Sequence, residues 1–151
     1  MTLVYLDVCC LNRPFDDQSQ GRVKLEAEAV LLILSQVERG NFRWASSEAV
    51  IHEIRQIRDS DRRQRLLQSI TLAGETVEIT SEIQCRATEL VRLGFGAMDS
   101  LHLACAETAE CLIFLITDDR LLKRASDCRR KIRVLVKNPL TWAQGMFDYS
   151  A

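Results

Sequence analysis

Apolar residues along this chain follow two different periods. Short unbroken apolar runs over 3–6 and 111–116 are typical of strands buried on both faces, and alternation predicts another strand over 76–80. Elsewhere apolar residues recur at helical spacing, as in Ala27, Val30 and Leu34, which predicts a helix from about 23 to 40. Strand-like and helix-like segments therefore alternate.

The same pattern predicts the remaining elements. A loop is expected through Pro14 to Gly21, and Ser46 or Ser47 is a suitable N-cap for a helix that includes Ile54. Further strands are expected over 41–45 and 132–136, and further helices over 55–68, 81–93, 97–108, from Asp118 or Asp119, and after Pro139. Strands that alternate with helices predict an α/β fold, a three-layer α/β/α sandwich with a mainly parallel central sheet. No linker divides the chain, so we expect a single domain over residues 1–151.

Composition favours a globular protein. Hydrophobic residues make up 47% of the chain and charged residues 27%. The longest apolar runs, Ala29–Leu34 and Cys111–Ile116, are far shorter than the ~20 residues that span a bilayer. The N-terminus has no basic segment of the kind that begins a signal peptide. We therefore expect a cytoplasmic protein without membrane association.

Charge gives a weaker indication of the partner. The net charge of −1 provides no overall attraction to nucleic acid. Arginine nevertheless supplies all but four of the 20 cations, and its guanidinium suits bidentate contacts to phosphate, although genomic base composition produces the same bias.

The six cysteines do not predict a zinc site. No two of them form a C-x-x-C pair, which a zinc ribbon or knuckle requires. We expect small, reduced thiols, most of them in the core, and this includes the adjacent pair Cys9-Cys10.

Carboxylates fall where the predicted strands end. Asp7 follows the first strand, and Asp118 and Asp119 follow the strand at 111–116, while Glu53 and Asp99 lie within apolar helical segments. Ligands of open parallel sheets bind beyond the carboxyl ends of the strands. Each acid has a structural alternative, such as helix capping or pairing with a nearby arginine. Together they predict a site for a hard cation, Mg²⁺ or Mn²⁺.

Other chemistries fit less well. His52-Glu53 begins like the zinc motif H-E-x-x-H, but Gln56 stands where the second histidine is needed. The Gly94-x-Gly96 pair lacks the third glycine of a dinucleotide fingerprint. The other histidine, His102, is expected to pack within its helix.

Four segments in order resemble the PIN-domain family. They are Tyr5-Leu6-Asp7, Ser47 with Glu53, the run from Gly96 to Ala104 around Asp99, and Leu115-Ile116-Thr117-Asp118-Asp119. The resemblance implies a metal-dependent endoribonuclease, often a VapC-type toxin that is dimeric and bound by an antitoxin. It further implies that Asp7, Glu53, Asp99 and Asp119 hold Mg²⁺ or Mn²⁺, with Asp118 as a cap or outer-shell group.

One position departs from that family. Many members have Asn, Ser or Thr two residues after the first aspartate, where this chain has Cys9, and Asn12 is near enough to substitute. We expect RNA contacts from Asn12, Arg13, Arg120 and Arg124. Two arginine-rich segments, 55–65 and 120–131, are candidate rims for the RNA backbone. The alternatives are a PIN-fold RNA-binding or interaction protein without turnover, and a metal-dependent phosphatase.

Overall fold

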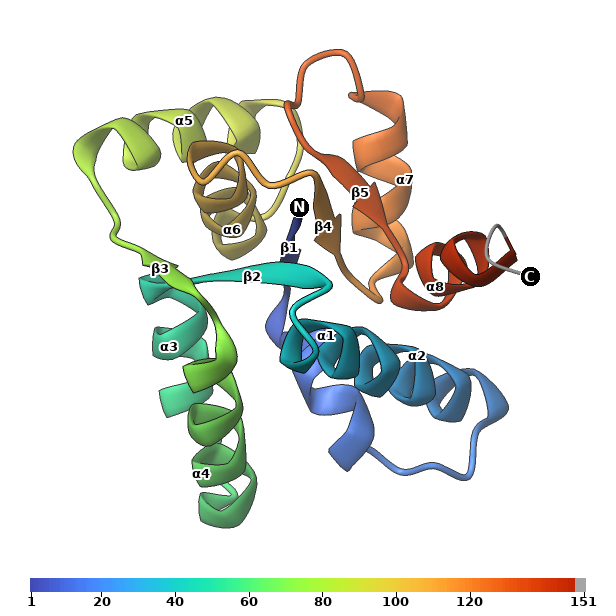
Figure 1. Ribbon diagram of the computed structural model, residues 1–151. Helices are drawn as coiled ribbons and strands as arrows, with labels where there is room; N and C mark the ends of the chain where they lie inside the picture. Colours follow the sequence, from blue (N-terminus) through green and yellow to red (C-terminus); the bar gives the residue numbers. More distant parts are fainter. Residues whose placement is uncertain (149–151) are drawn as a thin grey trace.

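A five-stranded parallel sheet forms the centre of the molecule (Figure 1). This computed structural model describes residues 1–148. The strand order is β3-β2-β1-β4-β5, and every neighbouring pair is parallel. The strands are β1 (Thr2–Leu6), β2 (Phe42–Ser47), β3 (Glu75–Val77), β4 (Ile113–Leu115) and β5 (Leu135–Lys137). The predicted α/β architecture is confirmed.

Helices cover both faces of this sheet. α5 packs against α6 on one face, and α1 and α2 lie on the other, where α2 packs against α8 (Figure 1). The helices are α1 (Val8–Asn12), α2 (Gly21–Glu38), α3 (Glu48–Arg55), α4 (Ser60–Ser69), α5 (Ser81–Arg92), α6 (Ala97–Thr108), α7 (Asp119–Asp127) and α8 (Pro139–Asp148), with short 3₁₀ turns η1 (Arg13–Phe15) and η2 (Ile70–Leu72). No helix among residues 1–148 is long and apolar enough to cross a bilayer.

The core lies where β1 and β4 adjoin. Tyr5, Leu6, Phe114 and Leu115 are fully buried, and the rings of Tyr5 and Phe114 stack with their centroids 5.2 Å apart. These residues belong to the two unbroken apolar runs, as expected for strands that are covered on both faces. The apolar runs therefore bring the predicted site acids to one edge of the sheet, because Asp7 directly follows the first run and Asp118 follows the second after Thr117.

Several boundaries differ from the sequence prediction. β4 is shorter than the apolar run at 111–116, and β3 and β5 lie at 75–77 and 135–137 rather than 76–80 and 132–136. The helix expected over 55–68 begins at Ser60, because Asp59 caps it by accepting hydrogen bonds from the amides of Asp61 and Arg62. Residues 8–12 form α1, although their sequence pattern predicts no helix.

Candidate active site

Asp7 is fixed at the carboxyl end of the central strand. Its amide donates to the Leu115 carbonyl oxygen at 3.1 Å, which extends the pairing of β1 with β4. Its carboxylate caps α1, because Oδ2 accepts a hydrogen bond of 3.1 Å from the amide of Cys9. The residue is only 7% exposed. One carboxylate oxygen is therefore held by the backbone, and Oδ1 faces the rest of the site.

Glu53 reaches the same place from α3. Ser47, the last residue of β2, caps this helix by accepting a hydrogen bond of 3.2 Å from the amide of Val50. The cap fixes where the helix begins, so Glu53 projects toward α6 rather than into solvent. There its Oε1 is hydrogen-bonded to Nε2 of His102.

His102 continues a buried hydrogen-bond chain. Its Nδ1 lies 2.7 Å from the Tyr5 hydroxyl, which lies 2.7 Å from the Ser47 hydroxyl. Tyr5, Ser47 and His102 are all fully buried. Buried polar groups require such partners, and here the chain holds the imidazole ring in one orientation. The histidine packs within its helix, as expected, but it also positions Glu53, which the sequence analysis did not foresee.

Asp7, Glu53 and His102 together can hold a metal ion. Each offers one ligand atom, and these atoms lie within 4.8 Å of one another. His102 Nε2 lies 3.7 Å from Asp7 Oδ1. Two carboxylates suit Mg²⁺ or Mn²⁺. Both ring nitrogens of His102 are hydrogen-bonded, to Tyr5 and to Glu53, so the imidazole orients Glu53. The donor set therefore fits a divalent cation.

Burial and the neighbouring carboxylates shift the pKa values of His102 and Tyr5. Burial lowers the pKa of His102, but the hydrogen bond to Glu53 and the carboxylate of Asp7 outweigh it, so the net shift is upward. Burial also raises the pKa of the Tyr5 hydroxyl well above its ordinary value, which keeps this link of the chain protonated.

Asp99 is a third carboxylate near the site, but like Asp119 it contributes no atom to the group of Asp7, Glu53 and His102. It lies in the first turn of α6, and its pKa is raised to about 6, first by burial and then by the charges of Asp7 and Asp118 and, less strongly, Glu53. A carboxylate that is hard to ionise among other carboxylates is what a cation-binding site without its cation should contain. Asp99 therefore belongs electrostatically with Asp7 and Glu53.

The two acids that follow β4 have different surroundings. Asp118 caps α7, accepting a hydrogen bond of 2.9 Å from the Arg120 amide, as its structural alternative predicted. Asp119 forms a bidentate pair with Arg22 of α2, with both N–O distances 2.7 Å. Arg22 lowers the pKa of Asp119. The structure thus turns the carboxylate of Asp119 toward α2, and it contributes no atom to the group of Asp7, Glu53 and His102.

One family model matches most of the sequence. The model of the PIN domain matches residues 4–127. The chain belongs to the PIN-domain family. The predicted family is therefore confirmed, over most of the sequence.

Solved structures agree on the fold of this PIN protein. Fourteen chains match, and one belongs to the crystal structure of VapBC2 from Rickettsia felis bound to a DNA fragment from their promoter. The match has a TM-score of 0.53 at 13% identity and covers 91% of this chain and 98% of that chain. At this identity the likeness shows the fold alone. No curated protein sequence matches this chain.

The residues expected to contact RNA are placed unevenly around the PIN site. Arg13 donates to the fully buried Glu26 and to Asp16, so its guanidinium is already engaged. The side-chain oxygen of Asn12 is buried without a hydrogen-bond partner among the described residues. Arg120 is exposed at the start of α7, which leaves its side chain accessible.

Arg124 lies against the turn before α6. Its Cζ atom is 3.0 Å from the point that a Cβ on Gly94 would occupy, and Gly94 has a φ of +106°. Only glycine adopts this conformation readily and leaves room for the guanidinium. Arg124 therefore packs over the turn that leads to the helix of Asp99.

The two arginine-rich segments also differ from one another. On α4, Arg62 donates to Asp16 and the Phe15 carbonyl oxygen. Two further arginines of this segment are also engaged: Arg63 with the Ile57 carbonyl oxygen and Arg65 with Asp61. In the segment after Asp119 no side-chain ion pair forms among the described residues, so its cations remain accessible. The rim beside α7 is the better candidate for the RNA backbone.

Cys9 occupies the position where many PIN proteins have a polar residue. Its Sγ accepts a weak hydrogen bond of 3.4 Å from the amide of Thr117, so the thiol joins the ends of β1 and β4. All six cysteines are free thiols, as expected. Cys9 therefore has a structural contact at the end of β1 in place of a polar side chain.

Proposed function

We propose that this PIN protein is a metal-dependent endoribonuclease whose ion is held by Asp7, Glu53 and Asp99. PIN domains are generally nucleases. The observation that carries the proposal is the meeting of two carboxylates and an imidazole at the carboxyl edge of the sheet, beside an aspartate whose pKa is raised to about 6. Asp119 would complete the set after release from Arg22, and Asp118 would remain an outer group.

The side chains of the site have two roles, holding the ion and fixing the orientation of the groups that hold it. Asp7, Glu53 and Asp99 would hold Mg²⁺ or Mn²⁺, which would supply a Lewis acid for the phosphodiester and a water of lowered pKa. Asp7 and Glu53 hold their oxygens in place through the Cys9 amide and through His102. Tyr5 and Ser47 keep the His102 ring in the orientation that this requires.

The RNA substrate is inferred from the charges around the site. The cluster itself is negative, so a polyanion needs cations beside it. Arg120, Lys123 and Arg124 on α7 directly follow the site acids, and exposed Arg55 lies on α3 two residues beyond Glu53. These residues would contact the backbone and make binding depend strongly on salt.

A protein partner is proposed on the fold likeness and the family. The matched structure is a VapBC2 complex, and we propose that this chain is likewise a cytoplasmic toxin, dimeric and restrained by an antitoxin. Co-purification with the product of an adjacent gene tests for the antitoxin, and sedimentation of the isolated chain tests for the dimer.

A second function is supported by one observation. Arg22 holds the carboxylate of Asp119 away from the cluster, as expected if the protein binds RNA through its PIN fold without turnover. A metal-dependent phosphatase is less well supported, because a small phosphate ester needs no row of cations.

The decisive experiment is cleavage of a pool of structured and single-stranded RNA in Mg²⁺, Mn²⁺ or EDTA. The variant Asp99→Asn tests the site, and Glu28→Gln, an exposed position on α2, is the matched control. We expect cleavage that is lost in EDTA and in Asp99→Asn but kept in Glu28→Gln. Folded protein that binds Mn²⁺ and RNA without cutting supports the second function, and absence of Mn²⁺ binding contradicts both the site and the mechanism.

A further inference from the structure

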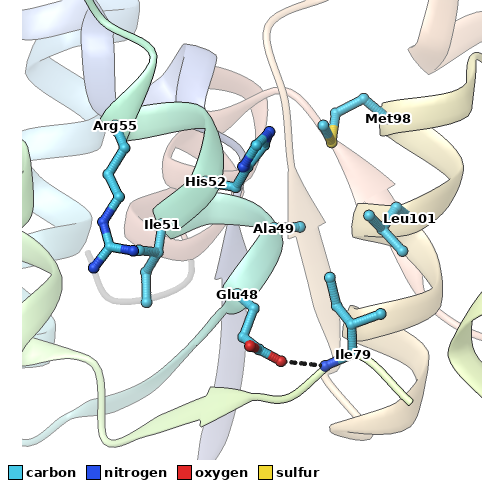
Figure 2. Close-up of a pocket in the computed structure, with 8 residues that line it drawn as sticks. All are labelled: Glu48, Ala49, Ile51, His52, Arg55, Ile79, Met98 and Leu101. Carbon is cyan, nitrogen blue, oxygen red and sulfur yellow. Dashed lines mark hydrogen bonds between the residues drawn. The ribbon is translucent and has the colours of Figure 1, made fainter.

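An apolar groove runs between α3 and α6, beside the carboxylates (Figure 2). Its volume is about 640 Å³, which is within the usual range for small-molecule sites. Ala49 and Ile51 line it from α3, and Met98 and Leu101 line it from α6. Met98 is 37% exposed, so an apolar side chain stands open to solvent at the mouth of the groove.

The groove adjoins the site through both helices. His52 precedes Glu53 in the sequence, and Leu101 precedes His102. Met98 likewise precedes Asp99 in the sequence. Successive residues of an α-helix project about 100° apart. The helix faces next to those that carry the site residues therefore form the groove, and the hydrogen bond between Glu53 and His102 joins the same two helices.

The polar side chains of the groove lie at different places along it. Figure 2 shows the side chains of His52 and Arg55 along the α3 side, and both are exposed. Neither forms an ion pair within residues 1–148. Glu48 is the acid of the lining, but its carboxylate accepts a hydrogen bond of 2.6 Å from the Ile79 amide and closes the far end.

We propose that this groove is a nucleobase subsite, which takes an unpaired base of the RNA strand next to the phosphate at the carboxylates. The base plane would lie on the apolar surface of Met98 and Leu101. His52 would stack or hydrogen-bond at the base edge, and Arg55 would meet the adjoining phosphate. Unpaired bases are recognised by such stacking and edge contacts, whereas a base within a duplex cannot enter a groove. The inference rests on the proposed function only in placing the RNA phosphate at the carboxylates.

The location of the groove favours RNA over a protein segment. It shares both helices with the site, and the exposed guanidinium of Arg55 complements phosphate, whereas the carboxylate of Glu48 accepts a hydrogen bond from the Ile79 amide at the far end. A nucleobase is also mostly apolar on its faces and polar at its edge, as the lining is. The proposal therefore predicts preference for single-stranded RNA and dependence on the bases as well as the backbone.

Binding can be measured without cleavage. We would titrate a 5′-fluorescein-labelled single-stranded RNA octamer of mixed sequence, and the same octamer without bases, by fluorescence anisotropy in EDTA. The test variant is Met98→Ser, and the control is Val91→Ser, an apolar residue 45% exposed on α5 and outside the groove. Wild type and Val91→Ser should bind the complete RNA about fivefold or more tightly than the abasic RNA, and Met98→Ser less than about twofold. Circular dichroism checks that both variants fold.

Photo-crosslinking locates the base directly. RNA carrying 4-thiouridine should crosslink to peptides that contain His52 or Met98. Crosslinks elsewhere only, equal binding of complete and abasic RNA, or unchanged discrimination in Met98→Ser would each overturn the subsite. A change of sedimentation in Met98→Ser with unchanged RNA binding would assign the groove to self-association instead.

The outcomes separate this proposal from the nuclease. Base-dependent binding that Met98→Ser abolishes, in a protein that cuts no RNA, retains the subsite and refutes turnover. Metal-dependent cleavage by a protein that binds complete and abasic RNA equally well supports the nuclease and refutes the subsite. Absence of RNA binding in EDTA together with absence of cleavage in Mg²⁺ and Mn²⁺ refutes both.

Discussion

Asp99→Asn should stabilise the protein when no metal is bound. At neutral pH Asp99 is ionised in the folded chain against burial and the charges of Asp7 and Asp118, which raise its pKa to about 6 from an ordinary value of 3.8. One pKa unit corresponds to ~1.36 kcal/mol, so the cost of ionisation has an upper limit of ~3 kcal/mol. Because the carboxyl is only half-buried and solvent screens its neighbours, we expect about 1 kcal/mol. Asparagine removes this cost, and an increase of about 1 kcal/mol in the free energy of unfolding raises Tm by about 3 °C.

The pH dependence distinguishes charge from packing. Below pH 3.8 Asp99 is protonated in the folded and the unfolded chain, so the variant gains nothing. Between pH 3.8 and 6 the folded chain keeps the proton while the unfolded chain loses it, and this contribution to wild-type stability falls as the pH rises. The gain from Asp99→Asn should therefore grow across this window and reach its full size above pH 6.

The assay is urea unfolding in EDTA at several pH values, with Glu28→Gln as the control, which should stay within about 0.5 kcal/mol of wild type. Saturating Mn²⁺ should reverse the order of stability. Wild type gains ~2.7 kcal/mol at a hundred times Kd, and a variant with a weakened site gains less. An Asp99→Asn variant that is no more stable than wild type at pH 7.5 in EDTA, or whose gain is the same at pH 3.5, would refute the charge cluster.

Three further substitutions test the framework of the site. Tyr5→Phe leaves the Nδ1 of buried His102 without its partner, so we expect a loss of about 1–3 kcal/mol in urea unfolding and weaker Mn²⁺ binding by calorimetry. Glu26→Gln removes the charge from a fully buried carboxylate that accepts from two arginines and should cost about 3 kcal/mol, measured as a fall in Tm. Gly94→Ala forces a side chain into a φ of +106° and against Arg124, so the free energy of unfolding should fall by about 1–3 kcal/mol. Adding Arg124→Ala should restore only the part of this loss that is due to the clash.

Much of the fold follows from the sequence for one physical reason. Strands that are buried on both faces must be apolar throughout, so β1 and β4 appear as unbroken runs that end at Asp7 and just before Asp118. Those two runs are the central pair of the sheet, and their carboxyl ends define the site. The edge strands β3 and β5 are partly exposed, and their limits depend on pairing, which the sequence pattern does not contain.

The candidate site was foreseen less completely, because contacts between distant elements decide it. His102 lies in an apolar helix like any packed histidine, and its link to Glu53 spans 49 positions. A buried imidazole between a tyrosine and a carboxylate can be found only when β1, α3 and α6 are placed together. The spacing Asp99-x-x-His102 was the available signal, since it puts both side chains on one face of the helix. The pairing of Asp119 with Arg22 over 97 positions had no signal in the sequence.

Glu53 and Asp119 differ in how easily their side chains can move. Glu53 is tied to a buried chain of three side chains, and breaking it would leave buried polar groups unpaired. Asp119 is tied to an exposed arginine, and exposed ion pairs contribute little because water and salt replace them readily. A divalent cation at Asp7, Glu53 and Asp99 would compete with a single guanidinium for Asp119. The Arg22 pair is therefore compatible with the proposed role of Asp119, because release requires a side-chain movement at the surface and no rearrangement of the core.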